Sequence, residues 1–186
     1  MSIVKDMSLA ESGRRKIDWV RDFMPALSQI EARFEKEKPF AGLRMAVSVH
    51  LEAKTANLGY VLSKGGAEVY LTGSNPLSTQ DDVAAGLASL GIETFGIYGA
   101  TPEEYESHLI ETLKCHHHIV IDDGGDLIEL LGGKCSEYGD CLLGGCEETT
   151  TGILRLIQMN RAGKLMFPMM LVNNAEEPYA HSQRTR

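Results

Sequence analysis

The sequence predicts a three-layer α/β fold built on a doubly wound, mainly parallel sheet. From residue 43 onwards, short apolar segments of strand type alternate with amphipathic helical segments. Such alternation is typical of parallel sheets that carry helices on both faces. Acidic and hydroxyl residues directly follow several apolar segments. Because open parallel sheets bind ligands outside the carboxyl ends of their strands, these residues are candidates for a binding site.

The composition is that of an ordinary globular domain. The 186 residues suffice for one well-packed domain, with 43% hydrophobic and 24% charged residues. The net charge of -8 argues against nucleic acid as a partner. No segment is long and apolar enough to cross a membrane, and the N-terminus lacks a signal-peptide pattern. We therefore expect a cytoplasmic protein.

Residues 8–37 are predicted to form a helical segment that packs outside the sheet. Ser8 or Ser12 could cap its start, and Pro25 should kink or divide it, because proline lacks a backbone donor. Its apolar residues recur at helical spacing, which predicts one buried stripe that serves packing rather than ligand chemistry. The stripe comprises Ile17, Val20, Phe23, Met24, Leu27, Ile30 and Phe34.

The strand–helix alternation follows this segment. Glycines stand at the predicted helix ends, and Pro102 stands in a first helical turn, where its missing N–H is tolerated. Strands are predicted at residues 43–49, 67–71, 93–97 and 119–121, and helices at residues 54–64, 80–90 and 101–114.

The strand at residues 119–121 ends in the sequence Asp-Asp-Gly-Gly-Asp. The three aspartates, Asp122, Asp123 and Asp126, repel one another, so the cluster costs stability unless it is solvated or occupied. One interpretation is a solvated, aspartate-rich turn. The other is a set of site residues delivered to the carboxyl edge of the sheet.

Residues 147–152 read Glu-Glu-Thr-Thr-Thr-Gly and precede an apolar-periodic run. Hydroxyl residues in this position predict a helix N-terminus, where threonine oxygens cap backbone N–H groups and where anions are favoured. The alternative is a capped helix whose glutamates only complement the helix dipole.

Polar residues also follow the earlier predicted strands. His50 comes after the first strand, and Asn75 and Ser78 come after the second. A lone histidine after a strand is commonly structural. The expected convergence of His50 with Asp123 and Glu148 on one edge of the sheet instead favours a functional site.

The cysteines offer no recognisable metal motif. They stand at positions 115, 135, 141 and 146, close to three consecutive histidines at 116–118. No C-x-x-C pair is present, so we predict no metal site and expect free thiols.

The stretches at residues 122–127 and 147–152 resemble the two signature motifs of adenosylhomocysteinase (S-adenosyl-L-homocysteine hydrolase). The resemblance covers about residues 3–173. Further matching motifs are Asp6–Ala10, Gly13-Arg14, Met24-Pro25, His50–Ala56 (HLEAKTA), Gly66–Val69, Asn75 and Ser78–Asp81.

The resemblance implies an NAD-dependent hydrolysis of S-adenosyl-L-homocysteine to adenosine and L-homocysteine. In that family bound NAD oxidises the ribose 3′-hydroxyl, homocysteine is eliminated, water adds at C5′, and the ketone is reduced again. By motif, His50 and Asp123 would transfer protons near C5′ and the leaving thiol, and Glu148 would hold a ribose hydroxyl. The implied substrate contacts are Glu52, Lys54, Thr55, Asn75, Ser78 and Asp126, and the implied cofactor contacts are Thr149, Thr150, Thr151 and Asn173.

The sequence departs from the family after residues 168–172. The family there supplies a Lys and an Asp that act in hydride transfer, whereas Pro178 and Ser182 fall at about those positions here. No G-x-G-x-x-G motif follows a strand. We therefore expect a truncated hydrolase: a substrate-binding domain at residues 1–173, a poorly ordered divergent tail at residues 174–186, and no NAD-binding domain.

Two classes of function stay open at this point. The chain can be the substrate half of an enzyme that acts with an NAD domain from another chain. Alternatively, it is an inactive module that binds nucleoside or associates with full-length hydrolase, or with itself as a homo-oligomer. Because hydride removal needs a bound acceptor, we expect the isolated chain to be inactive.

Overall fold

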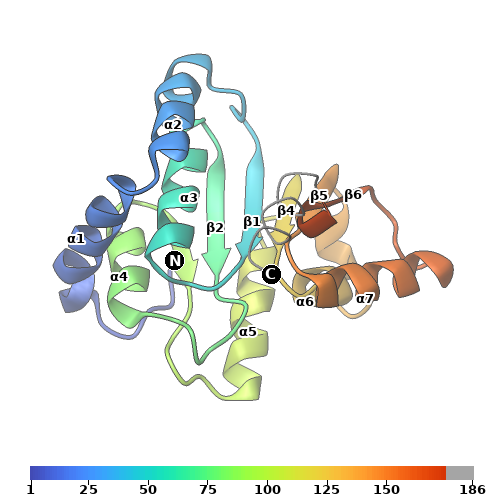
Figure 1. Ribbon diagram of the computed structural model, residues 1–186. Coiled ribbons are helices and arrows are strands. Elements are labelled where there is room, and N and C mark those ends of the chain that lie inside the picture. The colour runs from blue at the N-terminus through green and yellow to red at the C-terminus, as the bar shows by residue number, and fades with distance from the viewer. Residues whose placement is uncertain (175–186) are drawn as a thin grey trace, which may run out of the picture.

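A six-stranded, all-parallel sheet forms the centre of the computed structural model, which describes residues 1–174 (Figure 1). The strand order is β3-β2-β1-β4-β5-β6, so the chain winds outward in both directions from β1. This doubly wound, Rossmann-like arrangement confirms the predicted fold class. The strands are β1 (Arg44–Ser48), β2 (Glu68–Thr72), β3 (Glu93–Phe95), β4 (Ile119–Asp122), β5 (Gly144–Glu147) and β6 (Met169–Leu171).

Helices cover both faces of this sheet (Figure 1). No helix within residues 1–174 combines the length and the apolar character that crossing a membrane requires. The α-helices are α1 (Ala10–Arg21), α2 (Pro25–Glu37), α3 (Ala53–Lys64), α4 (Asp81–Ser89), α5 (Pro102–Leu113), α6 (Asp126–Leu131) and α7 (Thr150–Arg161).

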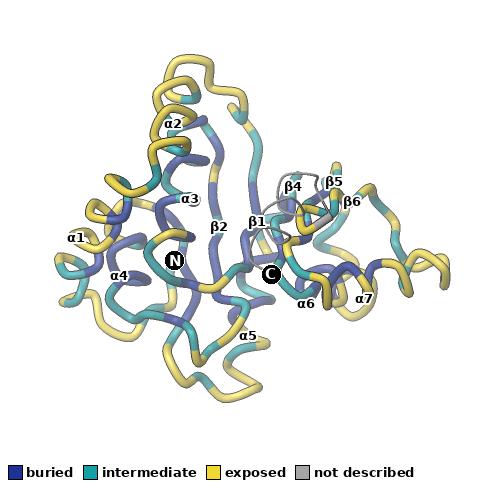
Figure 2. Tube along the Cα trace, in the orientation of Figure 1, coloured by how far each residue is buried: buried dark blue, intermediate teal, exposed yellow. Residues whose placement is uncertain are grey.

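The alternation of side chains along the strands builds two hydrophobic cores. In β1, Met45 and Val47 enter the core beneath α1, α3 and α4, whereas Ala46 enters the core beneath α5, α6 and α7. Successive residues of a strand point to opposite faces, which explains this division. In β4, Val120 likewise enters the second core. Figure 2 shows the central strands buried between the two helical layers.

The helical segment at residues 8–37 is divided as predicted, but its details differ. Residues 22–24 separate α1 from α2. The predicted serine cap is wrong: the carboxylate of Asp6 accepts from the backbone N–H of Ser8, and α1 begins after Leu9 without a side-chain cap. Capping by Asp6 satisfies a backbone donor of the short 3-10 turn that precedes α1.

The predicted buried stripe is correct only for α1. Ile17 and Val20 are buried, whereas Phe23 is 65% exposed and Ile30 is 37% exposed. No residue of α2 is buried, because this helix packs along α3 at the margin of the sheet rather than over it (Figure 2). Periodicity reported an apolar face but could not report how much of that face a neighbour covers.

Three elements are not predicted by the sequence pattern. The strand β5 contains Gly144 and Gly145, which have low strand propensity, and α6 and β6 are short. β5 is paired on both sides, with β4 and with β6. Tertiary pairing therefore overrides the weak local propensity of this segment.

The tail expected at residues 174–186 falls almost wholly outside the described residues. Asn174 ends a short 3-10 helix, Val172–Asn174. Pro178 and Ser182 lie outside the described residues.

Close approach of two backbones joins α1 to α4. A Cβ atom placed on Gly13 would lie 1.7 Å from the carbonyl oxygen of Asp82, and one on Gly86 would lie 2.8 Å from the backbone nitrogen of Arg14. The Nζ of Lys16 lies 2.8 Å from the Asp82 carboxylate at the same crossing. Only glycine permits this spacing.

The substitution Gly13→Ala is expected to destabilise the protein by about 2–4 kcal/mol. Alanine normally favours a helix over glycine, but here the helices must separate because the obstructing atom belongs to the backbone. Gly59→Ala in α3 is the matched control, because its Cβ would meet only side-chain atoms, the nearest being the Cδ1 of Leu71 at 2.9 Å. Chemical denaturation measures both, and an equal or smaller loss for Gly13→Ala would contradict the assignment.

Candidate functional site

The carboxyl ends of four adjacent strands meet at one edge of the sheet. Their last residues lie in register: Ser48 pairs with both Thr72 and Asp122, and Asp122 pairs with Glu147. The loops that follow these strands therefore leave the sheet side by side. The reversal of winding between β1 and β4 lies at the centre of this edge, where doubly wound sheets bind ligands.

His50, Ser78 and Asp123 come together at this edge. The Nδ1 of His50 lies 2.6 Å from the Oγ of Ser78, and its Nε2 lies 3.7 Å from the Oδ2 of Asp123. The His50 side chain is 52% exposed, whereas that of Asp123 is only 8% exposed. The hydroxyl of Ser74, which the sequence reasoning missed, donates to the same Oδ2 at 3.1 Å. A solvent-facing imidazole is thus backed by a largely buried carboxylate.

The loop after β2 is shaped by Asn75. Its Oδ1 accepts from the N–H of Leu77 at 2.9 Å, and its backbone carbonyl accepts from the Ser78 hydroxyl at 3.0 Å. This turn holds Ser78 toward His50, while the amide NH₂ of Asn75 is the group that could donate to a ligand.

Glu148 lies on the loop between β5 and α7. Its backbone N–H donates to the carbonyl oxygen of Asp122 at 3.0 Å. Partial burial raises the pKa of the Glu148 carboxyl, and the nearby charges of Asp123 and Glu147 raise it further. Glu148 and Asp123 therefore lie close enough to influence each other.

Beneath the site lies a row of polar residues that are all buried: Thr72, Ser48, Asp122 and Glu147. Residues in register on parallel strands share a face, so these side chains point to the same side of the sheet. Asp122 accepts from the N–H of Asp123 at 3.0 Å and from that of Ile128 at 3.1 Å. Its pKa is raised to about 8, first by burial and then by the charge of Glu147.

Asp126 is engaged within the protein by both of its carboxylate oxygens. The Tyr105 hydroxyl donates to Oδ2 at 2.8 Å, and the Nη1 of Arg155 donates to Oδ1 at 2.6 Å. Arg155 also lies 3.0 Å from Glu129. These contacts tie α5, α6 and α7 together, and a contact between Asp126 and substrate stays a prediction. The sequence pattern does not predict that Tyr105 and Arg155 bond Asp126, because both residues lie far from Asp126 along the chain.

The predicted nucleoside contacts of the HLEAKTA motif open α3. One oxygen of Glu52 accepts from the N–H groups of Lys54 and Thr55 at 3.1 and 3.2 Å, so Glu52 caps the helix. Lys54 is exposed and Thr55 is buried. Their contact with a ligand stays a prediction.

The predicted helix N-terminus at residues 149–151 is present. The Oγ1 of Thr149 accepts from the N–H of Gly152 at 3.2 Å and therefore caps α7. The Oγ1 of Thr150 lies 2.7 Å from the Nδ2 of Asn173, and Thr151 is exposed. Three of the predicted cofactor contacts, Thr150, Thr151 and Asn173, thus stand at the exposed positive end of one helix.

The cysteine and histidine stretches lie apart from this edge. All four cysteines are free thiols, and within residues 1–174 no group of three or more His, Cys, Asp or Glu side chains is arranged to hold a metal ion. His117 is fully buried, and burial lowers its pKa to about 4.

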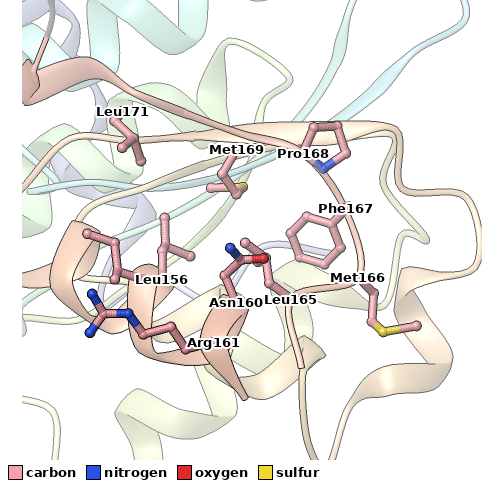
Figure 3. Close-up of a pocket in the computed structure, with 10 residues that line it drawn as sticks. Leu156, Asn160, Arg161, Leu165, Met166, Phe167, Pro168, Met169 and Leu171 are labelled. Atoms are coloured by element: carbon pink, nitrogen blue, oxygen red, sulfur yellow. The ribbon is translucent and has the colours of Figure 1, made fainter. Parts of the chain in front are cut away.

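Two hollows also lie away from His50. One of about 540 Å³ lies between α7 and the segment leading into β6, and its lining combines apolar side chains such as Phe167 with the polar Asn160 and Arg161 (Figure 3). Another of about 550 Å³ lies between α5 and α6 beside Tyr105. His50, Asp123 and Glu148 line neither hollow. Because the His50 side chain is 52% exposed, the predicted site is open to solvent in the described chain.

Comparison with known proteins gives one consistent family. The family described as S-adenosyl-L-homocysteine hydrolase matches residues 1–139. An S-inosyl-L-homocysteine hydrolase of Methanocaldococcus jannaschii is 50% identical over 181 residues, which are 97% of this chain and 44% of that protein. An adenosylhomocysteinase of Pyrococcus abyssi is 46% identical over 181 residues, covering 97% and 43%. The chain thus spans less than half the length of these curated relatives.

The raised pKa of Asp122 predicts a pH-dependent stability. The folded state keeps the Asp122 proton up to about pH 8, whereas an unfolded aspartate loses it above 3.8. The contribution of Asp122 is therefore complete below pH 3.8 and is lost as pH rises to about 8. In Asp122→Asn this part of the pH dependence should vanish, with a constant cost of about 1–2 kcal/mol for one lost acceptor. Urea unfolding of both proteins from pH 5 to 8.5 measures the difference, and parallel curves would contradict the prediction.

Proposed function

Because the chain belongs to the S-adenosyl-L-homocysteine hydrolase family, we propose that it carries the substrate-binding half of an enzyme that hydrolyses a nucleoside–homocysteine thioether. The products would be the free nucleoside and L-homocysteine. The observation that carries the proposal is the cluster of His50, Ser78 and Asp123 at the carboxyl edge, with Glu148 on the adjoining loop.

The geometry of His50 supports a role in proton transfer. One ring nitrogen lies against the Ser78 hydroxyl and the other faces the Asp123 carboxylate at 3.7 Å. An imidazole can both accept and donate a proton, and a carboxylate beside it orients the ring. His50 and Asp123 would then move protons at C5′ and at the departing homocysteine sulfur.

Glu148 and Asn75 would bind the ribose. A carboxyl group whose pKa is raised by burial and by Asp123 suits a hydrogen bond to a hydroxyl, because it can accept or donate according to its protonation state. The Asn75 NH₂ group supplies a donor from the opposite loop. The two loops flank β1 and β4, across which a ribose ring would lie.

The family reaction implies NAD, and part of this chain fits it. Thr150, Thr151 and Asn173 present hydroxyl and amide groups at the start of α7, a position that suits a polar cofactor. Thr149 is committed to its cap and to Glu147, so its role would be to order the helix start. When bound, NAD would supply the hydride acceptor for oxidation of the ribose 3′-hydroxyl, and the resulting 3′-ketone would make the C4′ proton acidic.

The proposed substrate can carry either of two purine bases. Relatives of similar identity are named for inosyl and for adenosyl substrates. Glu52, Lys54 and Thr55 at the start of α3 are the proposed base-facing residues, so both purines belong in any binding test.

A second candidate is nucleoside binding without turnover by this chain alone. The finding that favours it is the exposure of the edge, since the His50 side chain is 52% exposed. In this case the chain would act as a module that associates with an NAD-binding chain or with a second copy.

The chain should bind adenosine or inosine. Glu148→Ala should weaken the affinity for the tighter-binding nucleoside by about tenfold or more, because the hydrogen bond from Glu148 to the ribose is lost. Glu106→Ala serves as the control, because Glu106 lies on α5 and pairs with Lys134. Isothermal titration calorimetry measures the affinities. Equal binding by wild type and Glu148→Ala, or no binding to either nucleoside, would remove the support for the ribose site.

The isolated chain is expected to release no homocysteine from S-adenosyl- or S-inosyl-homocysteine, even with excess NAD. Hydride removal requires an acceptor held within near-attack distance of C3′, and the groups at the start of α7 supply only one side of such a site. A thiol assay measures release. Turnover above that of Glu148→Ala would establish that this chain captures the cofactor unaided and would rule out the binding-only alternative.

A further inference from the structure

We propose that Glu147 is a positioning residue: its buried carboxylate clamps the loop after β4 to the start of α7 and thereby fixes Asp123 opposite Glu148. The inference rests on the proposed function, because Asp123 and Glu148 are the groups assigned there to proton transfer and to ribose. Glu147 itself is fully buried, and its carboxyl group bonds Gly124 and Thr149 rather than Asp123 or Glu148.

One oxygen atom of Glu147 makes the clamp. Its Oε1 accepts from the N–H of Gly124 at 2.9 Å, from the N–H of Thr149 at 2.8 Å and from the Thr149 hydroxyl at 2.8 Å. Gly124 directly follows Asp123 in the chain, and Thr149 directly follows Glu148. A single side-chain atom therefore bonds both functional loops.

The clamp extends into the helix through Thr149. The Thr149 hydroxyl donates to Glu147, and its oxygen accepts from the N–H of Gly152 at 3.2 Å. The bond to Glu147 therefore orients the hydroxyl that caps α7. Loss of this bond would loosen both the Gly124 loop and the helix start, because they share one acceptor.

The space around Glu147 is matched to the length of its side chain. A Cβ atom on Gly152 would lie 2.1 Å from the carboxyl carbon of Glu147 and 2.2 and 2.5 Å from its oxygens. Gly124 donates its N–H from a backbone φ of 107°, which side-chain-bearing residues rarely adopt. Both glycines thus accommodate the carboxylate, and an aspartate, one methylene shorter, could not reach both loops.

The charge of Glu147 has an effect separate from its hydrogen bonds. Its Oε2 is buried and has no hydrogen-bond partner within residues 1–174. The charge contributes to the raised pKa of Glu148 and to that of Asp122. Burial of an incompletely paired carboxylate costs stability. A site that uses both the hydrogen bonds and the charge of Glu147 gives a reason for this cost.

Two variants separate the clamp from the charge. Glu147→Gln keeps an acceptor oxygen for both loops and removes the charge, whereas Glu147→Asp keeps the charge and shortens the reach. Leu87→Ala is the control for lost stability, because Leu87 is buried in the other core, on α4. Amide hydrogen exchange at Gly124 and Thr149, NMR titration of the Glu148 carboxyl and nucleoside affinity are the measurements.

In Glu147→Asp we expect exchange at Gly124 and Thr149 to accelerate by about tenfold or more, and nucleoside affinity to fall by about tenfold. Glu147→Gln should leave amide exchange at Gly124 and Thr149 and the affinity for nucleoside close to those of the wild type. The pKa of Glu148 should fall in this variant, because the charge of Glu147 is removed. Leu87→Ala should lower the melting temperature without changing exchange at these two amides beyond the global effect, and without changing the Glu148 titration.

The proposal is overturned if Glu147→Asp lowers only the melting temperature, or if Leu87→Ala reproduces its local effects. Should Glu147→Asp fail to fold, faster exchange at Gly124 and Thr149 in Glu147→Gln, which keeps the acceptor oxygen, overturns it equally. If the wild-type chain binds neither nucleoside, the proposed function fails. Exchange and titration in the free protein then still decide whether Glu147 positions the loops.

Discussion

Two buried carboxyl groups, those of Asp122 and Glu147, end neighbouring strands inside the fold, and the order of the surrounding loops depends on them. Burying a carboxylate is costly unless hydrogen bonds replace the lost water. Backbone N–H groups supply this replacement from residues 123, 124, 128 and 149. The need to solvate two buried carboxyl groups thus organises the loops that carry Asp123 and Glu148.

The helical layer over the first core supports the other half of the site. α4 begins directly after the loop that holds Asn75 and Ser78, and α1 crosses it at the contact of Gly13 with Gly86. The Nζ of Lys16 on α1 also contacts Gln80 at 3.3 Å, next to that loop. The N-terminal helix therefore backs a functional loop without contributing a residue to the edge itself.

The openness of this edge bears on the chemistry. A reaction that passes through a reactive ketone needs water to be excluded, and the His50 side chain is 52% exposed in the described chain. Binding a nucleoside demands less, because hydrogen bonds and a partly buried carboxylate suffice for recognition. The exposed edge of the described chain therefore suits nucleoside binding better than it suits turnover.

The sequence by itself determined the doubly wound fold, the strand-end positions of His50, Asn75 and Asp123, the place of Glu148 just before a helix, and the threonine cap of α7. These features follow from apolar periodicity and from local capping, which neighbouring residues encode. Only the tertiary structure decided that Ser74 bonds Asp123 across 49 positions, that Tyr105 and Arg155 engage Asp126, and that α2 stays exposed. Such contacts depend on which strands and helices become neighbours in space. The role proposed for Glu147 is likewise visible only in the tertiary structure, because its partner Gly124 follows a different strand, 23 positions earlier in the chain.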